Sequence, residues 1–131
     1  MYQDRSTGSS YAGAYNKRKV GQEYEALAEK YLQQHGCKIL ERNYRNRSGE
    51  IDLIVLDGET IVFVEVKFRK TLHAGTPLEA VNFRKQKQIC KVSDYYRLTH
   101  GISEFCALRF DVISVLDDEV TWLKNAFEYL G

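Results

Sequence analysis

The chain has 131 residues, of which 44% are hydrophobic and 28% charged, as is typical of one globular domain. Nineteen Lys and Arg residues against 18 Asp and Glu give a formal charge of +1, which excludes a histone-like polycation and an acidic disordered chain. No apolar run reaches the length of a transmembrane helix, and no secretory signal pattern is present. Three cysteines without CxxC spacing favour free thiols, so we expect a cytoplasmic protein without membrane contact.

Residues 1–17 predict a flexible N-terminal tail, because they are rich in Ser, Gly and Tyr and show no apolar periodicity. A single domain is expected over 18–131. It begins with a helix over 18–35, where apolar residues recur at helical spacing and Gly36 suits a left-handed helix end. Glu25 lies at the edge of the apolar stripe, so it is the acid of this helix that we expect to face inward.

Strands are expected where short runs rich in β-branched and aromatic residues lie between turn residues. Asp57-Gly58 separates two such runs and is typical of a hairpin turn. The expected strands cover residues 37–44, 50–56, 60–68, 106–116 and 120–123.

A loop over 69–76 and a second helix over 83–99 are expected between the third and fourth strands. The segment Thr76-Pro77-Leu78-Glu79 has the capping-box pattern, and Asn82 is an alternative cap. The order of helix, three strands, helix and two strands predicts an α/β fold, with a mixed central β-sheet flanked by helices.

The hairpin carries the acids of greatest interest. Side chains alternate between the faces of a strand, so Glu65 and Lys67 share one face. With a two-residue loop, Asp52 is a diagonal neighbour of Glu65; with a four-residue loop it lies directly opposite Glu65. Both loops place Asp52, Glu65 and Lys67 on one surface, whereas an odd loop or a bulge would separate them.

Two carboxylates at this separation repel each other unless a cation or a proton lies between them. Oxygen ligands select Mg²⁺ or Mn²⁺ over zinc. Lys67 could hold or deprotonate a water molecule beside a scissile phosphate. The alternative is a solvated hairpin whose acids pair with Lys67 and nearby arginines. Both interpretations stay open, although the apolar neighbours of the acids make simple solvation less favourable.

Two stretches, 38–48 and 82–98, carry more basic than acidic residues. Basic stretches beside clustered acids suit a site that holds a metal and a phosphate polymer together, whereas two solvated faces are the alternative. The residues expected to bind a nucleic-acid backbone are Arg42, Arg45, Arg47, Arg84, Lys85 and Lys87.

Other candidate residues favour structural roles. Asp111 lies inside an apolar strand, where we expect it to pair with Arg109 or an inner lysine. Cys37, Cys90 and Cys106 are expected to be small buried side chains.

Asp52 is followed, after twelve intervening residues, by Glu65-Val66-Lys67. This spacing resembles the PD-(D/E)XK nuclease signature, with Ile51 in place of the proline. A longer set of motifs resembles the YraN family (UPF0102) of bacterial proteins over roughly residues 18–127. These motifs are Gly21-x-x-x-Glu25-x-x-Ala28-x-x-Tyr31-Leu32, Ile39-Leu40-x-Arg42-Asn43, Gly49-Glu50-Ile51-Asp52-Leu53-Ile54, Val62-Phe63-Val64-Glu65-Val66-Lys67, Lys85, Arg109-Phe110-Asp111-Val112 and Asn125-Ala126-Phe127.

The resemblance implies a restriction-endonuclease-like fold, similar to that of archaeal Holliday-junction resolvases. It implies that Asp52 and Glu65 bind Mg²⁺ or Mn²⁺, with the backbone carbonyl of Val66 as a further ligand. Glu25 would act from the first helix, directly or through a water molecule, and Lys67 would orient or activate the attacking water.

The function implied by the resemblance is metal-dependent hydrolysis of DNA phosphodiester bonds, directed by a branched structure such as a Holliday junction. A homodimer would present two identical sites to such a substrate. The alternative is a non-catalytic nucleic-acid-binding protein of the same fold. A purely structural adaptor, which would bind neither DNA nor metal, is a third class.

Overall fold

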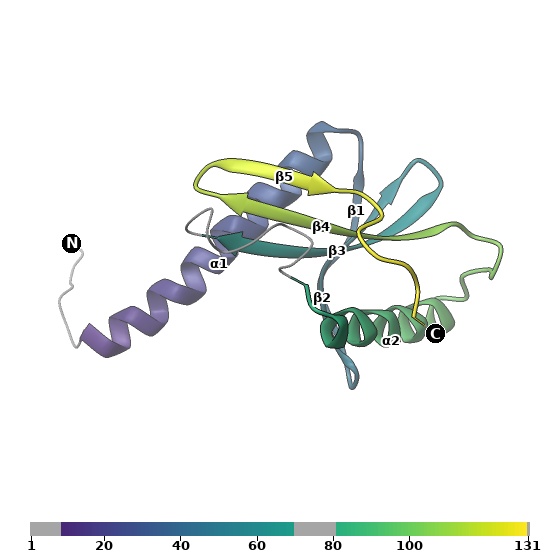
Figure 1. The fold of residues 1–131 in the computed structure, drawn as a ribbon, viewed down its shortest axis with the longest axis horizontal. Coiled ribbons are helices and arrows are strands. Elements are labelled where there is room, and N and C mark those ends of the chain that lie inside the picture. Colours follow the sequence, from purple (N-terminus) through teal and green to yellow (C-terminus); the bar gives the residue numbers. More distant parts are fainter. Residues whose placement is uncertain (1–8, 70–80, 131) are drawn as a thin grey trace.

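The computed structural model describes the backbone of residues 9–69 and 81–130, and the side chains of residues 20–69 and 81–130. Two helices and five strands follow one another in the expected αβββαββ order (Figure 1). Their bounds are α1 (Ser9–Gln34), β1 (Lys38–Asn46), β2 (Gly49–Asp57), β3 (Thr60–Arg69), α2 (Phe83–Thr99), β4 (Leu108–Leu116) and β5 (Glu119–Leu123). The α/β class and the element order predicted from the sequence are therefore confirmed.

The strands form one mixed sheet in the order β1-β2-β3-β4-β5. Neighbouring strands run antiparallel except β3 and β4, which are parallel. A parallel pair needs a crossover connection, and α2 forms part of that connection (Figure 1).

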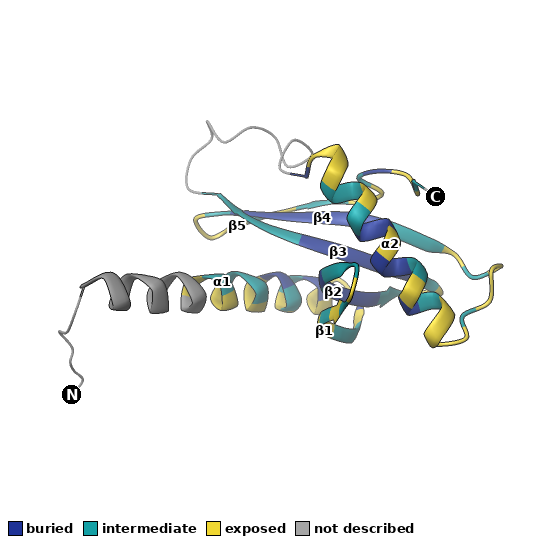
Figure 2. Ribbon diagram, turned by 90° about the horizontal axis from the view of Figure 1, so that it is seen from below, coloured by how far each residue is buried: buried dark blue, intermediate teal, exposed yellow. Residues whose placement is uncertain are grey.

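The two helices cover opposite faces of the sheet, because alternate side chains of each central strand point to opposite sides. Ala28 and Leu32 of α1 pack with Val62 and Val64 of β3 on one face. Ile89, Val92 and Tyr96 of α2 pack with Ile54, Phe63, Phe110 and Val112 on the other. Figure 2 shows the buried central parts of β3 and β4 between the helices. Each face therefore has its own apolar core, and the sheet holds the two cores together.

Helix α1 begins at Ser9, whereas the sequence predicted a tail up to residue 17. Extending an existing helix costs much less than starting one, whereas apolar periodicity reports packing. The absence of periodicity therefore did not exclude a helix. Leu27 and Leu32 both belong to the apolar pattern of this helix, but Leu32 is buried whereas Leu27 is 38% exposed.

Helix α2 spans the expected range of residues 83–99. Asn82 is its N-cap, with extended backbone and a side chain that accepts a hydrogen bond from the Lys85 backbone N–H at 2.9 Å. Residues 70–80 lie outside the described part of the chain. They include the alternative cap at residues 76–79 and all but the first residue of the loop expected over 69–76. Within the described ranges, no helix combines the length and apolar character needed to cross a membrane.

Candidate metal and nucleic-acid site

The register of the β2–β3 hairpin decides how the two central acids meet. Asp57 pairs with Thr60 and Leu53 with Val64. Continuing this register by one position brings Asp52 opposite Glu65. This is the register that was predicted for a four-residue loop. The loop itself is short, because the pairing already begins at Asp57 and Thr60.

Strand β2 parts from β3 where the acids lie. The β2–β3 pairing ends at Leu53 and Val64, while β2 continues to pair with β1 as far as Gly49. The Val66 N–H donates instead to Asp52 Oδ2, at 2.8 Å. Because the N–H and C=O of a strand residue face the same neighbouring strand, the Val66 carbonyl faces this opening as well. The opening therefore gathers a carboxylate and a backbone carbonyl.

Asp52 and Glu65 form an acid pair. Glu65 is only 6% exposed, and the two side chains share a hydrogen bond. Burial, followed by the negative charge of Asp52, raises the pKa of Glu65 to about 7. Burial also raises the pKa of Asp52, although the Val66 N–H opposes that rise. Below about pH 7 the pair therefore retains a proton between its two carboxyl groups.

Two lysines approach the same oxygen of this acid pair. Lys67 Nζ lies 3.5 Å from Glu65 Oε2, and Lys85 Nζ lies 3.7 Å from it. The sequence placed Lys67 on this surface, but it assigned Lys85 only to the nucleic-acid backbone. Lys85 comes from the first turn of α2, so the helix adds a second positive charge beside the carboxyl group.

Glu25 approaches the acid pair from α1. Its pKa is raised mainly by burial and then by the negative charges of Asp52 and Glu50. Glu29, one turn further along the helix, differs: its pKa is lowered because Arg42 donates a side-chain hydrogen bond to it. Glu25 is thus an acid of α1 that lies close enough to Asp52 for the negative charge of Asp52 to raise its pKa. This agrees with its expected inward position.

The acid pair fits a hard dication in the chemistry of its donor atoms. Among the described residues, no three Asp, Glu, His or Cys side chains form a metal-binding cluster. The pair nevertheless offers two carboxyl groups beside the Val66 carbonyl, and all of these donors are oxygen. Mg²⁺ characteristically takes one or two carboxylates and keeps several water molecules.

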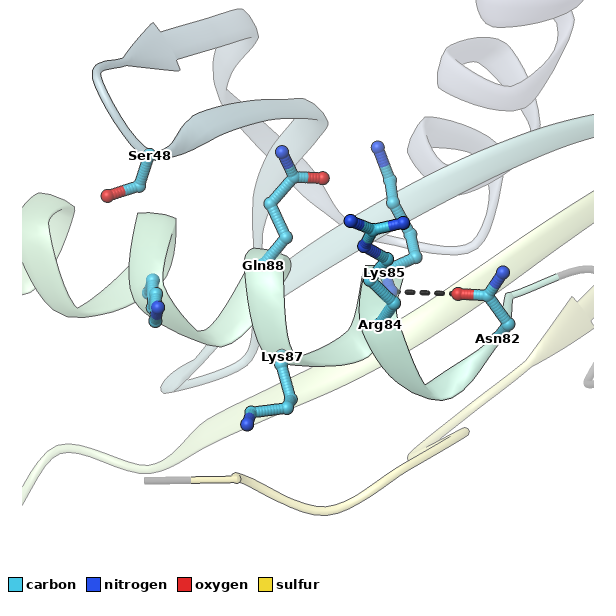
Figure 3. Close-up of a pocket in the computed structure, with 7 residues that line it drawn as sticks. Ser48, Asn82, Arg84, Lys85, Lys87 and Gln88 are labelled. Carbon is cyan, nitrogen blue, oxygen red and sulfur yellow. Dashed lines mark hydrogen bonds between the residues drawn. The ribbon is translucent and has the colours of Figure 1, made fainter.

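A pocket of about 530 Å³ lies beside α2, and we call it the cationic pocket. Four basic residues line it, Arg84, Lys85, Lys87 and Lys91, together with the polar residues Ser48, Asn82 and Gln88. No acidic residue is among these lining residues in the described part of the chain. In Figure 3, Lys85 and Gln88 point to the side of α2 on which the turn carrying Ser48 lies, whereas Lys87 points to the opposite side.

A second pocket, of about 380 Å³, lies between α2 and the β1–β2 turn, and we call it the turn pocket. Its lining includes Arg45, Arg47 and Glu50, and it shares Ser48, Lys85 and Gln88 with the cationic pocket. The two pockets are therefore contiguous, and Lys85 both lines them and lies beside Glu65 of the acid pair.

Five of the six basic residues singled out from the sequence line these pockets; Arg42 does not. Arg42 instead makes a bidentate pair with Glu29, with both contacts at 2.7 Å, on the α1 side of the sheet. The sequence analysis did not include Gln88 and Lys91 among the site residues. Gln88 lies four residues after Arg84, and Lys91 lies four residues after Lys87, so helical spacing from residues already singled out was a usable signal.

Asp111 has the structural role expected from the sequence. It is 1% exposed and accepts two hydrogen bonds from Arg109, one from the Trp122 indole and one from the Asn125 backbone. Because all of these donors come from β4, β5 and the segment after them, Asp111 fixes this edge of the fold.

The cysteines are free thiols. Cys37 and Cys90 are buried as expected, whereas Cys106 is only partly buried because it precedes β4 rather than lying within it.

Comparison with known proteins points to one family. Residues 24–115 match the model of the family described as "Uncharacterised protein family UPF0102". A UPF0102 protein of Photobacterium profundum is 47% identical over 113 residues, covering 84% of this chain and 90% of its own length. Relatives from Lachnoclostridium phytofermentans and Vibrio parahaemolyticus are 41% and 40% identical over 116 residues. They cover 88% and 87% of this chain, and 98% and 96% of their own lengths.

Proposed function

We propose, from the premise that this chain belongs to the UPF0102 family, that it is a metal-dependent endonuclease that hydrolyses phosphodiester bonds in DNA. Family membership alone specifies no reaction, so the proposal depends on the site. The observation that carries it is an acid pair, the half-buried Asp52 and the buried Glu65, with two lysines beside Glu65, one of which also lines a pocket rich in basic residues.

In this proposal Asp52 and Glu65 hold Mg²⁺ or Mn²⁺, with the Val66 carbonyl as a further ligand. Such an ion, when bound, supplies a water molecule of lowered pKa and offsets charge that develops on the phosphate. Lys67 lies beside Glu65 and orients the attacking water. Glu25 lies within the field of Asp52 and acts through a water molecule. The proposed catalytic and metal-binding residues thus come from β2, β3 and α1.

The proposed substrate is DNA, recognised through its backbone. Basic side chains without a fixed pattern of paired donors and acceptors hold phosphates but do not read bases. The cationic pocket has this character, because its lining is basic and polar. We further propose that branched DNA is preferred and that a homodimer presents two sites to it. Cytoplasmic localisation, which the free thiols favour, remains part of this proposal.

A cleavage assay tests the proposal. Purified protein is incubated with four-way junction, flapped and linear DNA in Mg²⁺ or Mn²⁺, beside Lys67→Ala and Asp52→Asn. Glu59→Gln is the matched control, because Glu59 is an exposed carboxylate in the turn of the same hairpin. We expect metal-dependent cleavage by the wild type and by the control, and a loss of at least about a hundredfold in both site variants. Cleavage that persists in Asp52→Asn would contradict the proposal.

A second candidate is a nucleic-acid-binding protein that does not cut. It is favoured by the composition of the cationic pocket, whose lining includes neither Asp52 nor Glu65, so DNA could bind there without the acid pair. This candidate predicts equal DNA affinity in the wild type and Lys67→Ala, without cleavage of any substrate in either metal.

A further inference from the structure

Lys85 lies at the boundary between the acid pair and the cationic pocket. Its backbone is held in the first turn of α2, where its N–H donates to the Asn82 side chain. Its side chain is 33% exposed and lines both the cationic pocket and the turn pocket. Its ammonium group nevertheless lies 3.7 Å from Glu65 Oε2. The side chain therefore reaches the acid pair from a fixed base, with open space beside it.

The contact with Glu65 is a loose ion pair. A distance of 3.7 Å exceeds the range of a good hydrogen bond between nitrogen and oxygen. Lysine carries a compact charge on a stem with four rotatable bonds, so a change of rotamer releases the contact. The ammonium group can therefore leave Glu65 without any movement of α2.

The oxygen that Lys85 contacts has a second ammonium group beside it, because Lys67 Nζ lies 3.5 Å from the same atom. A dication held by the acid pair would repel both ammonium groups. Lys67 extends from β3 beside Glu65 and lines neither pocket. Lys85, by contrast, has the adjoining pocket available to it, and a phosphate bound there would attract it.

We propose that Lys85 couples metal binding to nucleic-acid binding. It pairs with Glu65 while the acid pair holds no dication, and it turns to a backbone phosphate in the cationic pocket when a dication is bound. Each ligand then strengthens the binding of the other, because coupling between two sites is reciprocal. This inference depends on the proposed function, since it takes DNA and a dication as the two ligands.

The salt dependence of DNA binding measures this coupling directly. The logarithm of the association constant falls with the logarithm of the salt concentration, with a slope of about −0.9 for each phosphate contact to duplex DNA. If Lys85 contacts phosphate only in the metal-bound state, replacing it lowers the magnitude of the slope by about 0.9 in that state. In the metal-free state the replacement leaves the slope almost unchanged.

The experiment uses a fluorescein-labelled four-way junction and fluorescence anisotropy, with wild type, Lys85→Gln and Lys87→Gln. Each is titrated at several KCl concentrations, either in EDTA or in Ca²⁺ at a concentration that saturates each variant. A gel confirms that the DNA stays intact in Ca²⁺. Lys87 is the matched control, because it lines the same pocket but points away from the side of α2 on which Lys85 lies (Figure 3).

We expect Lys85→Gln to differ from the wild type by about 0.9 in slope in Ca²⁺ and by close to zero in EDTA. Lys87→Gln should differ from the wild type equally in both media. Adding Ca²⁺ should also increase the DNA affinity of the wild type at least about fivefold more than that of Lys85→Gln.

Equal effects of Lys85→Gln in EDTA and Ca²⁺, with DNA still bound, would refute the coupling and leave the proposed function standing. A wild type that binds neither DNA nor Ca²⁺ would refute the proposed function, and the coupling with it. A gain from Ca²⁺ that is equally large in Lys85→Gln would show that the dication acts by charge alone, which also refutes the coupling.

Discussion

Replacing Glu65 by glutamine removes a buried carboxyl group whose pKa is raised to about 7. Glutamine has nearly the same shape and stays neutral at every pH. Because the pKa of Glu65 is higher in the folded protein than in the unfolded chain, Glu65 binds its proton more tightly in the folded state. Its contribution to the free energy of unfolding is therefore fully present below about pH 4.5 and is lost as the pH rises through 7.

The size of the effect follows from the two pKa values. The interval from 4.5 to about 7 corresponds to about 3 kcal/mol, at about 1.4 kcal/mol for each pH unit. At pH 5 wild type and Glu65→Gln should differ in stability by less than about 1 kcal/mol. At pH 8 the variant should be more stable by as much as about 3 kcal/mol. Glu65 lowers the pKa of Asp52 through the hydrogen bond between the two side chains, and the glutamine amide can donate the same bond to Asp52.

Urea unfolding in EDTA between pH 5 and pH 8 measures this difference. Glu59→Gln serves as the control, since Glu59 is exposed. The free energy of unfolding of this variant should match that of the wild type at every pH. A stability difference between wild type and Glu65→Gln that stays constant over this range would show that Glu65 does not titrate there, which contradicts its raised pKa.

Three further substitutions test the supporting structure by urea unfolding. Asp111→Ala should cost about 3–5 kcal/mol, because it removes the acceptor of four hydrogen bonds and leaves Arg109 with only the partly exposed Asp57 as its partner; wild-type stability would contradict this role. Asn82→Ala should cost about 1 kcal/mol through loss of the α2 cap, and no loss would show that the cap is redundant. Gly49→Ala should cost about 1–3 kcal/mol, because Gly49 has a φ of 145° and its Cβ would lie 2.6 Å from Gln88. Adding Gln88→Ala should restore only part of that loss, and full recovery would refute the backbone contribution.

The arrangement of the acid pair could be predicted because it depends on local rules. The period of two along a strand places Glu65 and Lys67 on one face, and a hairpin at Asp57 brings Asp52 to the same surface. Local rules left two registers open. The structure selects the one in which Asp57 pairs with Thr60.

The contacts that the sequence did not predict depend on how helices lie across the sheet. Lys85 reaches Glu65 because α2 crosses the face that carries the acid pair, and no pattern within residues 83–99 specifies that crossing. Arg42 binds Glu29 because β1 lies beside α1, although the two residues are 13 positions apart. Such contacts between elements decide which basic residues remain free to bind a ligand.

The proposed reaction requires that Asp52 and Glu65 together hold a dication in the opening between β2 and β3. Crystals of the protein grown in Mn²⁺ test it most directly, through anomalous difference density collected near the manganese edge. We expect one strong peak within about 2.5 Å of a carboxylate oxygen of each acid, and no such peak in crystals of Asp52→Asn. Crystals in millimolar Mn²⁺ that show the two carboxyl groups still bonded to each other, without a peak between them, would contradict it.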